Sequence, residues 1–263
     1  MDFLNITGKC FLISGVANKK SIATQVTRDL LENGAKVYLS VQSEQHKEKA
    51  QKLFPDCPIL VVDVQNKGDL AELTDYFLKQ EVQLDGFLHS IAFANYAGGI
   101  KPFHETSWED FALATQVSCH SLMAISNSLK DVFTQEAAVV TISISNTKAT
   151  SYGHMGPVKA LLESSVGYLA KSFSAFSEVR FNAVCAGPLK TSASAGIPGY
   201  IDNYLFAEKL ILRKKALKTQ EVANTVLFLL SPRSSGVNGT GVLVDGGMIL
   251  NTFDEEVVQK TQS

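Results

Sequence analysis

The sequence predicts an α/β protein built on a Rossmann-like, doubly wound parallel sheet of about seven strands with helices on both faces. Short apolar runs alternate along the chain with amphipathic stretches of about ten or more residues. Strands that alternate with such helices pair in parallel through right-handed crossovers. The chain has 263 residues, of which 45% are hydrophobic and 19% charged. That length and composition suit a single domain, residues 1–263, with a large buried core.

The expected elements follow one another without a linker or an internal repeat. The expected strands cover residues 10–14, 36–41, 59–62, 86–89, 138–144, 179–184 and 241–244. The expected helices are a segment ending at residue 33, then 44–53, 70–78, 106–129, 152–174 and 219–230. The 106–129 helix opens on a sequence typical of a capping box, Thr106-Ser107-Trp108-Glu109.

One region, residues 187–217, has no regular pattern and is longer than ordinary loops. It begins directly after an expected strand, at the edge of the sheet where doubly wound folds bind ligands. It is therefore either a lid over a ligand site or an inert elaboration of the surface.

Charge and composition exclude several classes of protein. A formal net charge of -2 gives no electrostatic reason to expect nucleic acid or an anionic membrane as a partner. The chain opens without a signal-peptide pattern, and no run reaches the ~18 apolar residues of a spanning helix. We therefore expect a cytoplasmic protein. The four cysteines and five histidines are scattered, which favours free thiols over disulfides and predicts no metal site.

A dinucleotide site is predicted at the carboxyl ends of the first four strands. Gly15 follows the first strand, and a glycine turn there lets backbone N–H groups and a helix N-terminus approach a pyrophosphate. Gly15 is the only glycine of the usual G-x-G-x-x-G pattern, so this loop alone is as consistent with a plain turn. Polar and small residues follow the next three strands and strengthen the prediction. They are Gln42, Asp63, Val64, Ser90, Ile91 and Ala92.

The residue after the second strand favours NADH over NADPH. Gln42 stands where an acidic residue usually holds an NAD ribose or an arginine accommodates the NADP phosphate. An amide can hydrogen-bond a ribose but offers no countercharge to a phosphate. Lys19, Lys20 and Lys47 lie in neighbouring loops and could supply that charge, so NADPH stays the less favoured alternative.

Tyr152 and Lys159 are the candidate catalytic residues. They are seven residues apart, which is about two turns of a helix, so on one helix they share a face. A nearby ammonium lowers the pKa of a phenol and can hydrogen-bond a ribose or a substrate oxygen, which suits reduction chemistry. The alternative for an isolated pair is a half-buried aromatic and a solvated charge.

With these residues placed, the chain resembles the short-chain dehydrogenase/reductase superfamily, and within it the bacterial enoyl-[acyl-carrier-protein] reductases. The resemblance runs from Gly8 to Gly247. It rests on the glycine loop with Ser-Ile six residues after Gly15, on Asp85-Gly86-Phe87-Leu88-His89-Ser90-Ile91-Ala92-Phe93-Ala94, and on the Tyr-x6-Lys spacing. It also rests on Ala186-Gly187-Pro188-Leu189-Lys190-Thr191 and on Val244-Asp245-Gly246-Gly247.

The resemblance implies reduction of a trans-2-enoyl thioester, carried by acyl carrier protein or CoA, with NADH. Tyr152 would lie near the thioester and Lys159 would hold the nicotinamide ribose. Ala94, and Tyr200 in the 187–217 region, would contact the acyl substrate. The implied cofactor residues are Ser21, Ile22, Asp63, Val64, Ile91, Leu189, Lys190, Thr191, Ser192 and Ala193. The family assembles through its long central helices and last strand, which implies a homotetramer here.

One position departs from the family's pattern. The family usually has a second tyrosine about ten residues before the helix tyrosine, where this chain has Ile142 or, with a shorter connection, Ile144. Two alternatives to the enoyl reductase therefore stay open: a carbonyl reductase, and a catalytically idle relative that binds a nucleotide or a partner protein. Val139 stands where the usual carbonyl reductase has a serine.

Overall fold

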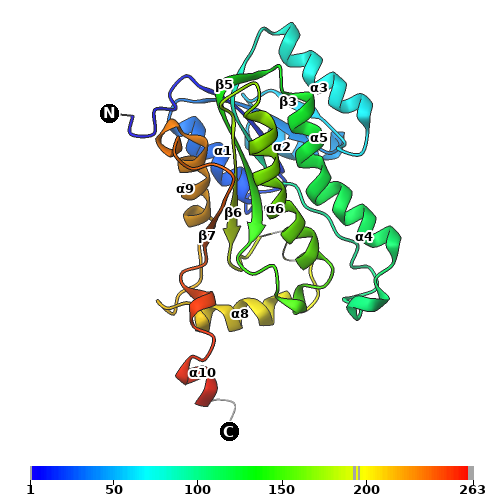
Figure 1. Ribbon diagram of the computed structural model, residues 1–263, viewed down its shortest axis with the longest axis vertical. Coiled ribbons are helices and arrows are strands. Elements are labelled where there is room, and N and C mark those ends of the chain that lie inside the picture. The colour runs from blue at the N-terminus through cyan, green and yellow to red at the C-terminus, as the bar shows by residue number, and fades with distance from the viewer. Residues whose placement is uncertain (1, 192–193, 195, 260–263) are drawn as a thin grey trace.

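The computed structural model describes residues 2–191, 194 and 196–259, and it contains the predicted seven-stranded sheet (Figure 1). All neighbouring strands pair in parallel, in the order β3-β2-β1-β4-β5-β6-β7. The order reverses between β1 and β4, which is where doubly wound folds bind ligands. The strands are β1 (Cys10–Ser14), β2 (Lys36–Val41), β3 (Ile59–Val61), β4 (Leu84–His89), β5 (Phe133–Ile144), β6 (Arg180–Ala186) and β7 (Gly241–Val244).

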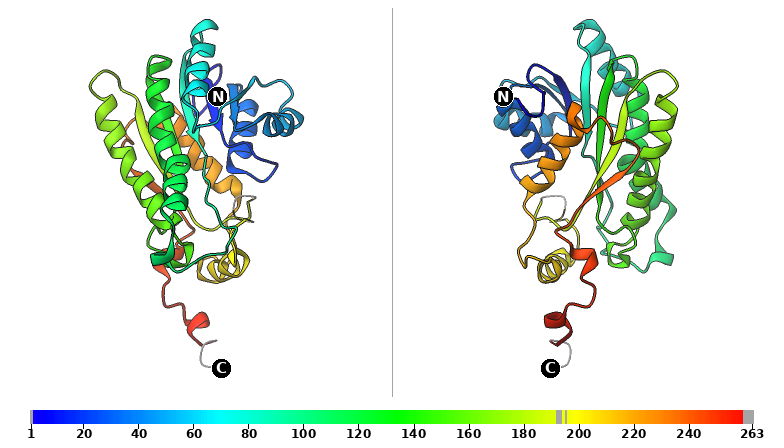
Figure 2. Two further views of the ribbon diagram at one scale, coloured as in Figure 1. Left: turned by 90° about the vertical axis from the view of Figure 1, so that its right-hand side faces the viewer. Right: turned by 60° about the vertical axis from the view of Figure 1, so that its left-hand side comes forward.

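Helices cover both faces of the sheet (Figure 2). One face carries α1 (Ile22–Glu32), α2 (Glu44–Leu53) and α9 (Thr219–Leu230), and the other carries α3 (Lys67–Lys79), α4 (Trp108–Thr115), α5 (Ser121–Ser128) and α6 (Met155–Phe173). Strand β1 shows why both faces are buried. Phe11 and Ile13 belong to the first core and Leu12 to the second, and all three are fully buried. A strand with apolar residues on both sides needs a helical layer on each.

The expected strands are all present, with small differences at their ends. The largest is in β5, which begins at Phe133 instead of residue 138. The cap of the 106–129 helix lies one residue later than the predicted capping box, since Ser107, and not Thr106, is the N-cap and its Oγ accepts a hydrogen bond from Asp110 N at 3.1 Å. Between α4 and α5, residues Gln116–His120 form a π-helix, so the predicted single helix contains one wider turn.

The 187–217 region differs from the prediction because it contains a regular helix, α8 (Tyr200–Leu210). Gly199 precedes it with φ 70°, and the helix buries Tyr204 and Ala207. Sequence periodicity missed α8 because few of its residues are buried. The helix lies beyond the carboxyl ends of β5 and β6, at the lower end of Figure 1. A last short helix, α10 (Glu255–Gln259), projects away from the domain at the same end (Figure 1).

The described part of the chain contains neither a membrane-spanning helix nor a cluster of metal-binding side chains. Within residues 2–191, 194 and 196–259, no helix is long and apolar enough to cross a membrane. The same residues contain no group of three or more His, Cys, Asp or Glu side chains that could hold a metal ion. All four cysteines are free thiols.

Candidate active site

The ends of β1 and β4 approach closely at Gly15. Gly15 has φ 97°, and a Cβ added there would lie only 2.1 Å from Ser90 O. The backbone N–H of Ser90 donates to Ser14 O at 3.3 Å. Only glycine permits this contact, because any side chain would overlap the backbone of Ser90.

The N-terminus of α1 is arranged to receive an anion. Ser21 caps the helix by accepting Thr24 N at 3.1 Å, and Thr24 Oγ1 donates to Asn18 O at 2.7 Å. The backbone N–H groups of Ile22 and Ala23 make no hydrogen bond within the described residues. Free N–H groups in the first turn of a helix bind phosphate groups well. This loop therefore fits a dinucleotide pyrophosphate although it lacks the later glycines.

The residues predicted to follow the next strands lie at the same edge of the sheet. Gln42 is exposed just after β2. Asp63 is half-buried, its backbone N–H donates to Asp69 Oδ2 at 2.8 Å, and its Oδ1 accepts Gln65 N at 3.0 Å. Its other carboxylate oxygen makes no hydrogen bond within the described part of the chain, so it can accept one from an adenine amino group.

Small and apolar residues after β3 and β4 line this edge. Val64, Ile91 and Ala94 pack against the core on the α3–α6 face, while Ala92 is exposed. Ser118 is a positioning residue that sequence reasoning missed: its hydroxyl accepts Phe93 N at 2.9 Å and donates to Phe93 O at 3.0 Å. This exchange holds the backbone beside Ala94. A serine inside a helical stretch gives no sequence signal of such a role.

Lys159 lies on α6 and holds its amine, buried, beside the end of β5. The alternative that Lys159 is a solvated surface charge is therefore excluded. The residue is 5% exposed, and Nζ donates to Ile142 O at 2.8 Å. Burial lowers the pKa of Lys159 to about 8. An ammonium carries three donors, so two remain for a ligand.

Tyr152 does not lie on α6 as the seven-residue spacing predicts. It ends a short 3-10 helix, Thr150–Tyr152, and Gly153 then turns the chain with φ 61° before α6 begins at Met155. The predicted lowering of its pKa by an ammonium is also wrong. Burial, with smaller effects from Tyr96 and Tyr200, raises the pKa of Tyr152. The phenol is therefore protonated at neutral pH and can donate a hydrogen bond.

The segment after β6 is held by its own polar contacts. Tyr200 Oη accepts Leu189 N at 2.8 Å and donates to Leu189 O at 3.0 Å, so this hydroxyl is occupied by the backbone. Thr191 N donates to Ser194 Oγ at 2.9 Å. Lys190 is exposed, with Nζ 4.5 Å from the centroid of the Tyr204 ring. Two predicted cofactor residues, Ser192 and Ala193, lie outside the described residues.

A buried histidine supports the centre of the site, and sequence reasoning gave it no role. His89 ends β4, and its ring nitrogens lie 2.9 Å from Thr141 Oγ1 and 2.8 Å from Ser121 Oγ. Burial lowers the pKa of His89 to about 3, so the ring is neutral. It links β4, β5 and α5 directly behind Ser90.

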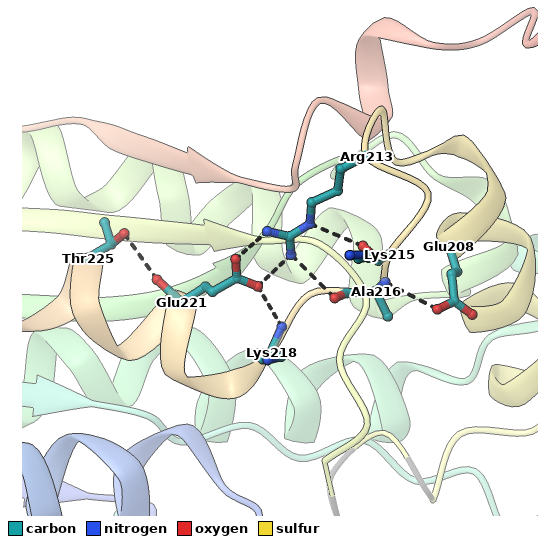
Figure 3. Close-up of polar contacts among 7 residues, drawn as sticks. All are labelled: Glu208, Arg213, Lys215, Ala216, Lys218, Glu221 and Thr225. Carbon is teal, nitrogen blue, oxygen red and sulfur yellow. Dashed lines mark hydrogen bonds and ion pairs between the residues drawn. The ribbon is translucent and has the colours of Figure 1, made fainter.

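The base of the 187–217 region is tied to the start of α9 (Figure 3). Both terminal nitrogens of Arg213 donate to the Glu221 carboxylate, and Arg213 also donates to the backbone oxygens of Lys215 and Ala216. Glu221 Oε2 accepts Lys218 N at 2.8 Å as well. A planar guanidinium paired with a carboxylate in this way is geometrically well defined.

These features define a short-chain dehydrogenase/reductase. The free N–H groups at the start of α1, the residues that follow β3 and β4, and the Lys159 amine beside β5 all lie at the carboxyl edge of the sheet, and Tyr152 follows the end of β5. The fold alone would not show this, because doubly wound sheets serve many activities.

The comparisons identify the family. The family model described as enoyl-(acyl carrier protein) reductase matches residues 15–249, and the chain belongs to that family. It is 33% identical over 251 residues to the NADPH-dependent enoyl-[acyl-carrier-protein] reductase FabI of Staphylococcus aureus, covering 93% of this chain and 98% of that protein. It is 34% identical over 252 residues to the NADH-dependent FabI of Nostoc, covering 93% and 97%.

Solved structures agree. The Aquifex aeolicus enoyl-[acyl-carrier-protein] reductase (NADH) matches with a TM-score of 0.87 and 30% identity, covering 93% of this chain and 98% of that one. The Bacillus cereus enoyl-acyl carrier protein reductase, solved with NADP+ and an indole naphthyridinone, matches with a TM-score of 0.88, 30% identity and the same coverage.

Proposed function

We propose that this protein reduces trans-2-enoyl thioesters of acyl carrier protein in fatty acid biosynthesis, with NADH as the preferred cofactor. The observation that carries the proposal is the buried Lys159 amine, which donates to Ile142 O near the carboxyl end of β5, at the edge of the sheet where the N-terminus of α1 can receive a pyrophosphate. Tyr152, a phenol that stays protonated, follows the end of the same strand. Family membership supports the same reaction.

The chain's residues bind and orient the reactants. When bound, the nicotinamide would supply a hydride to C3 of the enoyl group, and C2 would take up a proton from solvent. Lys159 holds the nicotinamide ribose with the two donors that Ile142 O leaves free. Tyr152 donates a hydrogen bond to the thioester oxygen as that oxygen gains negative charge, which stabilises the charge where it develops. Ala94 contacts the acyl substrate, and Tyr200 acts by holding Leu189 in place.

The remaining predicted residues bind the dinucleotide. Gly15, Ser21 and Ile22 receive the pyrophosphate, Asp63 accepts the adenine amino group, and Gln42 bonds the adenosine ribose. The other predicted residues line the cofactor. They are Val64, Ser90, Ile91, Ala92, Leu189, Lys190 and Thr191, while the predicted Ser192 and Ala193 lie outside the described residues.

The residues near β2 support NADH over NADPH. Gln42 has no charge, and Lys47, the nearest predicted countercharge on α2, lies with Nζ 3.7 Å from Glu44 Oε1. A lysine beside a carboxylate is a weaker partner for a phosphate. The relatives are named for either cofactor. Rates with equal NADH and NADPH test the preference, and Gln42→Arg should shift it towards NADPH.

One assay distinguishes the proposed reaction from its two alternatives. Oxidation of NADH is followed with a crotonyl thioester, with a ketoacyl thioester and with no substrate, while calorimetry measures NADH binding. Oxidation with the crotonyl thioester supports the enoyl reductase. Oxidation with only the ketoacyl thioester would show a carbonyl reductase, and binding without oxidation would show an idle relative.

A further inference from the structure

A polar pocket lies beside Tyr152 and is not used by the reaction described above. It is enclosed by the loop after β4 and by the turn that leads into α6. The residues that line it are Asn95, Tyr96, Gly98, Gly99, Ile100, Lys101, Thr106, Asp110, Gly153 and His154. Ile100 is the only aliphatic side chain of any length among them. Such a lining suits a ligand with hydrogen-bonding groups better than an alkyl chain.

Two buried polar atoms in the pocket lining have no partner. His154 is 8% exposed, and its Nε2 makes no hydrogen bond within the described part of the chain. The same is true of Tyr96 Oη. The centroids of the two rings are 5.7 Å apart. Burying such atoms without partners costs free energy that a ligand with matching groups can recover.

The pocket is adjacent to the catalytic phenol. His154 is two residues after Tyr152, and a Cβ added to Gly153 would lie 3.3 Å from Ile100 Cγ2, so the two segments are in contact. Tyr96 and Tyr152 pack against the same core. The loop opens to solvent, since Gly98, Gly99 and Lys101 are all exposed.

A carrier thioester has two parts that extend from its carbonyl in opposite directions. The acyl tail is apolar, and the exposed apolar side chains of α8, such as Ile201 and Phe206, suit it. The pantetheine arm contains amides, the first of which begins two methylene groups from the sulfur, and it must lead out to the carrier protein. A polar pocket that starts beside Tyr152 and ends at solvent fits the arm.

We propose that Tyr96 and His154 form a subsite that hydrogen-bonds the first amide of the pantetheine arm. The inference rests on the proposed enoyl reduction. Tyr96 Oη donates to the amide oxygen, and the neutral His154 Nε2 accepts the amide N–H or donates to the oxygen, according to its tautomer. The subsite selects thioesters that carry an amide at this distance from the sulfur.

The test compares three crotonyl thioesters that differ only beyond the sulfur. The first is the N-acetylcysteamine thioester, which has the amide; the second has an acetoxyethyl group, which keeps the carbonyl but lacks the N–H; the third has a pentyl group, which lacks both. We expect kcat/KM to be about tenfold higher for the amide than for the pentyl thioester, as one or two neutral hydrogen bonds give. The difference in kcat/KM between the amide and the acetoxyethyl thioester gives the contribution of the amide N–H.

Four variants complete the design. His154→Phe and Tyr96→Phe each keep the ring and remove the polar atom, and each should reduce the amide preference to about twofold or less. His104→Phe and Tyr76→Phe are the matched controls, since His104 is largely exposed and Tyr76 lies on α3, outside the pocket lining, and they should keep the preference. NADH affinity should not change in any variant. Tyr96→Phe serves as the test if His154→Phe does not fold.

The outcomes separate the two proposals. Equal kcat/KM for the amide and pentyl thioesters, or a preference that survives both pocket variants, would overturn the subsite while leaving the enoyl reductase intact. If the wild-type protein reduces none of the three thioesters but binds NADH, the proposed function itself is wrong, and the subsite falls with it.

Discussion

At the scale of single residues, Lys159 is the amine on which cofactor binding should depend. Lys159→Met removes the ammonium while filling most of its buried volume. We expect NADH affinity to fall roughly 10- to 100-fold, because charge-assisted hydrogen bonds to the ribose are lost, and activity to fall with it. Titration calorimetry measures the affinity. Lys171→Met, in the last turn of α6, is the control, and equal affinity in the two variants would refute the assignment.

The same residue predicts a pH dependence. Burial lowers the pKa of Lys159 to about 8, so the ammonium of the free protein loses its proton as the pH rises through that value. Binding that needs the ammonium must then take up a proton, and NADH affinity should fall above about pH 8. Calorimetry between pH 7 and pH 9 measures the affinity and the proton uptake on binding, which should reach about one proton at most. The NADH affinity of Lys159→Met should not change over this pH range.

Tyr152→Phe tests the phenol as the partner of the thioester oxygen. Only the hydroxyl is lost, so NADH affinity should stay within about twofold while turnover falls by roughly 10- to 1,000-fold, as for the loss of one donor to a developing oxyanion. Steady-state kinetics with a crotonyl thioester gives the turnover. Turnover that survives within about twofold would show that Tyr152 has another role.

At the scale of elements, α8 exposes apolar side chains where the acyl group is expected. Ile201, Leu205 and Phe206 are about half exposed, whereas Tyr204 is buried. We predict that residues 196–215 close over the bound thioester, because a cover of this kind excludes water from the reaction. Hydrogen exchange of α8 should slow when NADH and a slow acyl analogue are added together. Helix α3 is the internal control, and unchanged exchange in α8 would identify it as fixed scaffold.

The Arg213 and Glu221 pair should make the stability of this region depend on pH. Hydrogen bonds from Arg213 first, and then from the backbone of Lys218, lower the pKa of Glu221 to about 2 from its ordinary 4.5. A carboxyl whose folded pKa is lowered stabilises the protein above its unfolded pKa, and that stabilisation is lost as the pH falls from about 4.5 towards 2. The wild-type melting temperature should therefore exceed that of Glu221→Gln at pH 6, and the gap should narrow below about pH 4.5 and close only near pH 2. Glu178→Gln should show no such gap.

At the scale of the whole molecule, the outer faces of the central helices carry apolar side chains. Tyr168 on α6 is 78% exposed and Trp108 on α4 is 73% exposed, and Leu161 and Leu243 are partly exposed as well. Apolar groups on the long helices and the last strand are where the family resemblance implies subunit contacts. We predict a homotetramer in sedimentation at micromolar concentration. Tyr168→Glu should shift the protein to smaller species, and a wild-type monomer would contradict the prediction.

The sequence by itself determined the sheet and the edge that binds ligands. Runs such as residues 10–14 are apolar on both faces, and their alternation with amphipathic stretches leaves few other folds. Gly15, Asp63 and Ser90 could be placed together because parallel strands all end at one edge. These properties depend on the local order of residues, which can be read along the chain.

Only the tertiary structure decided how the site is assembled. Gly153 adopts a positive φ and takes Tyr152 off the helix, and burial then raises the pKa of Tyr152 although the spacing predicted a lower value. Lys159 reaches the carbonyl of Ile142, and Tyr96 meets His154 across two segments that are remote in sequence. Burial and contacts of this kind depend on how elements pack against one another, so the residue pattern within a single element does not predict them.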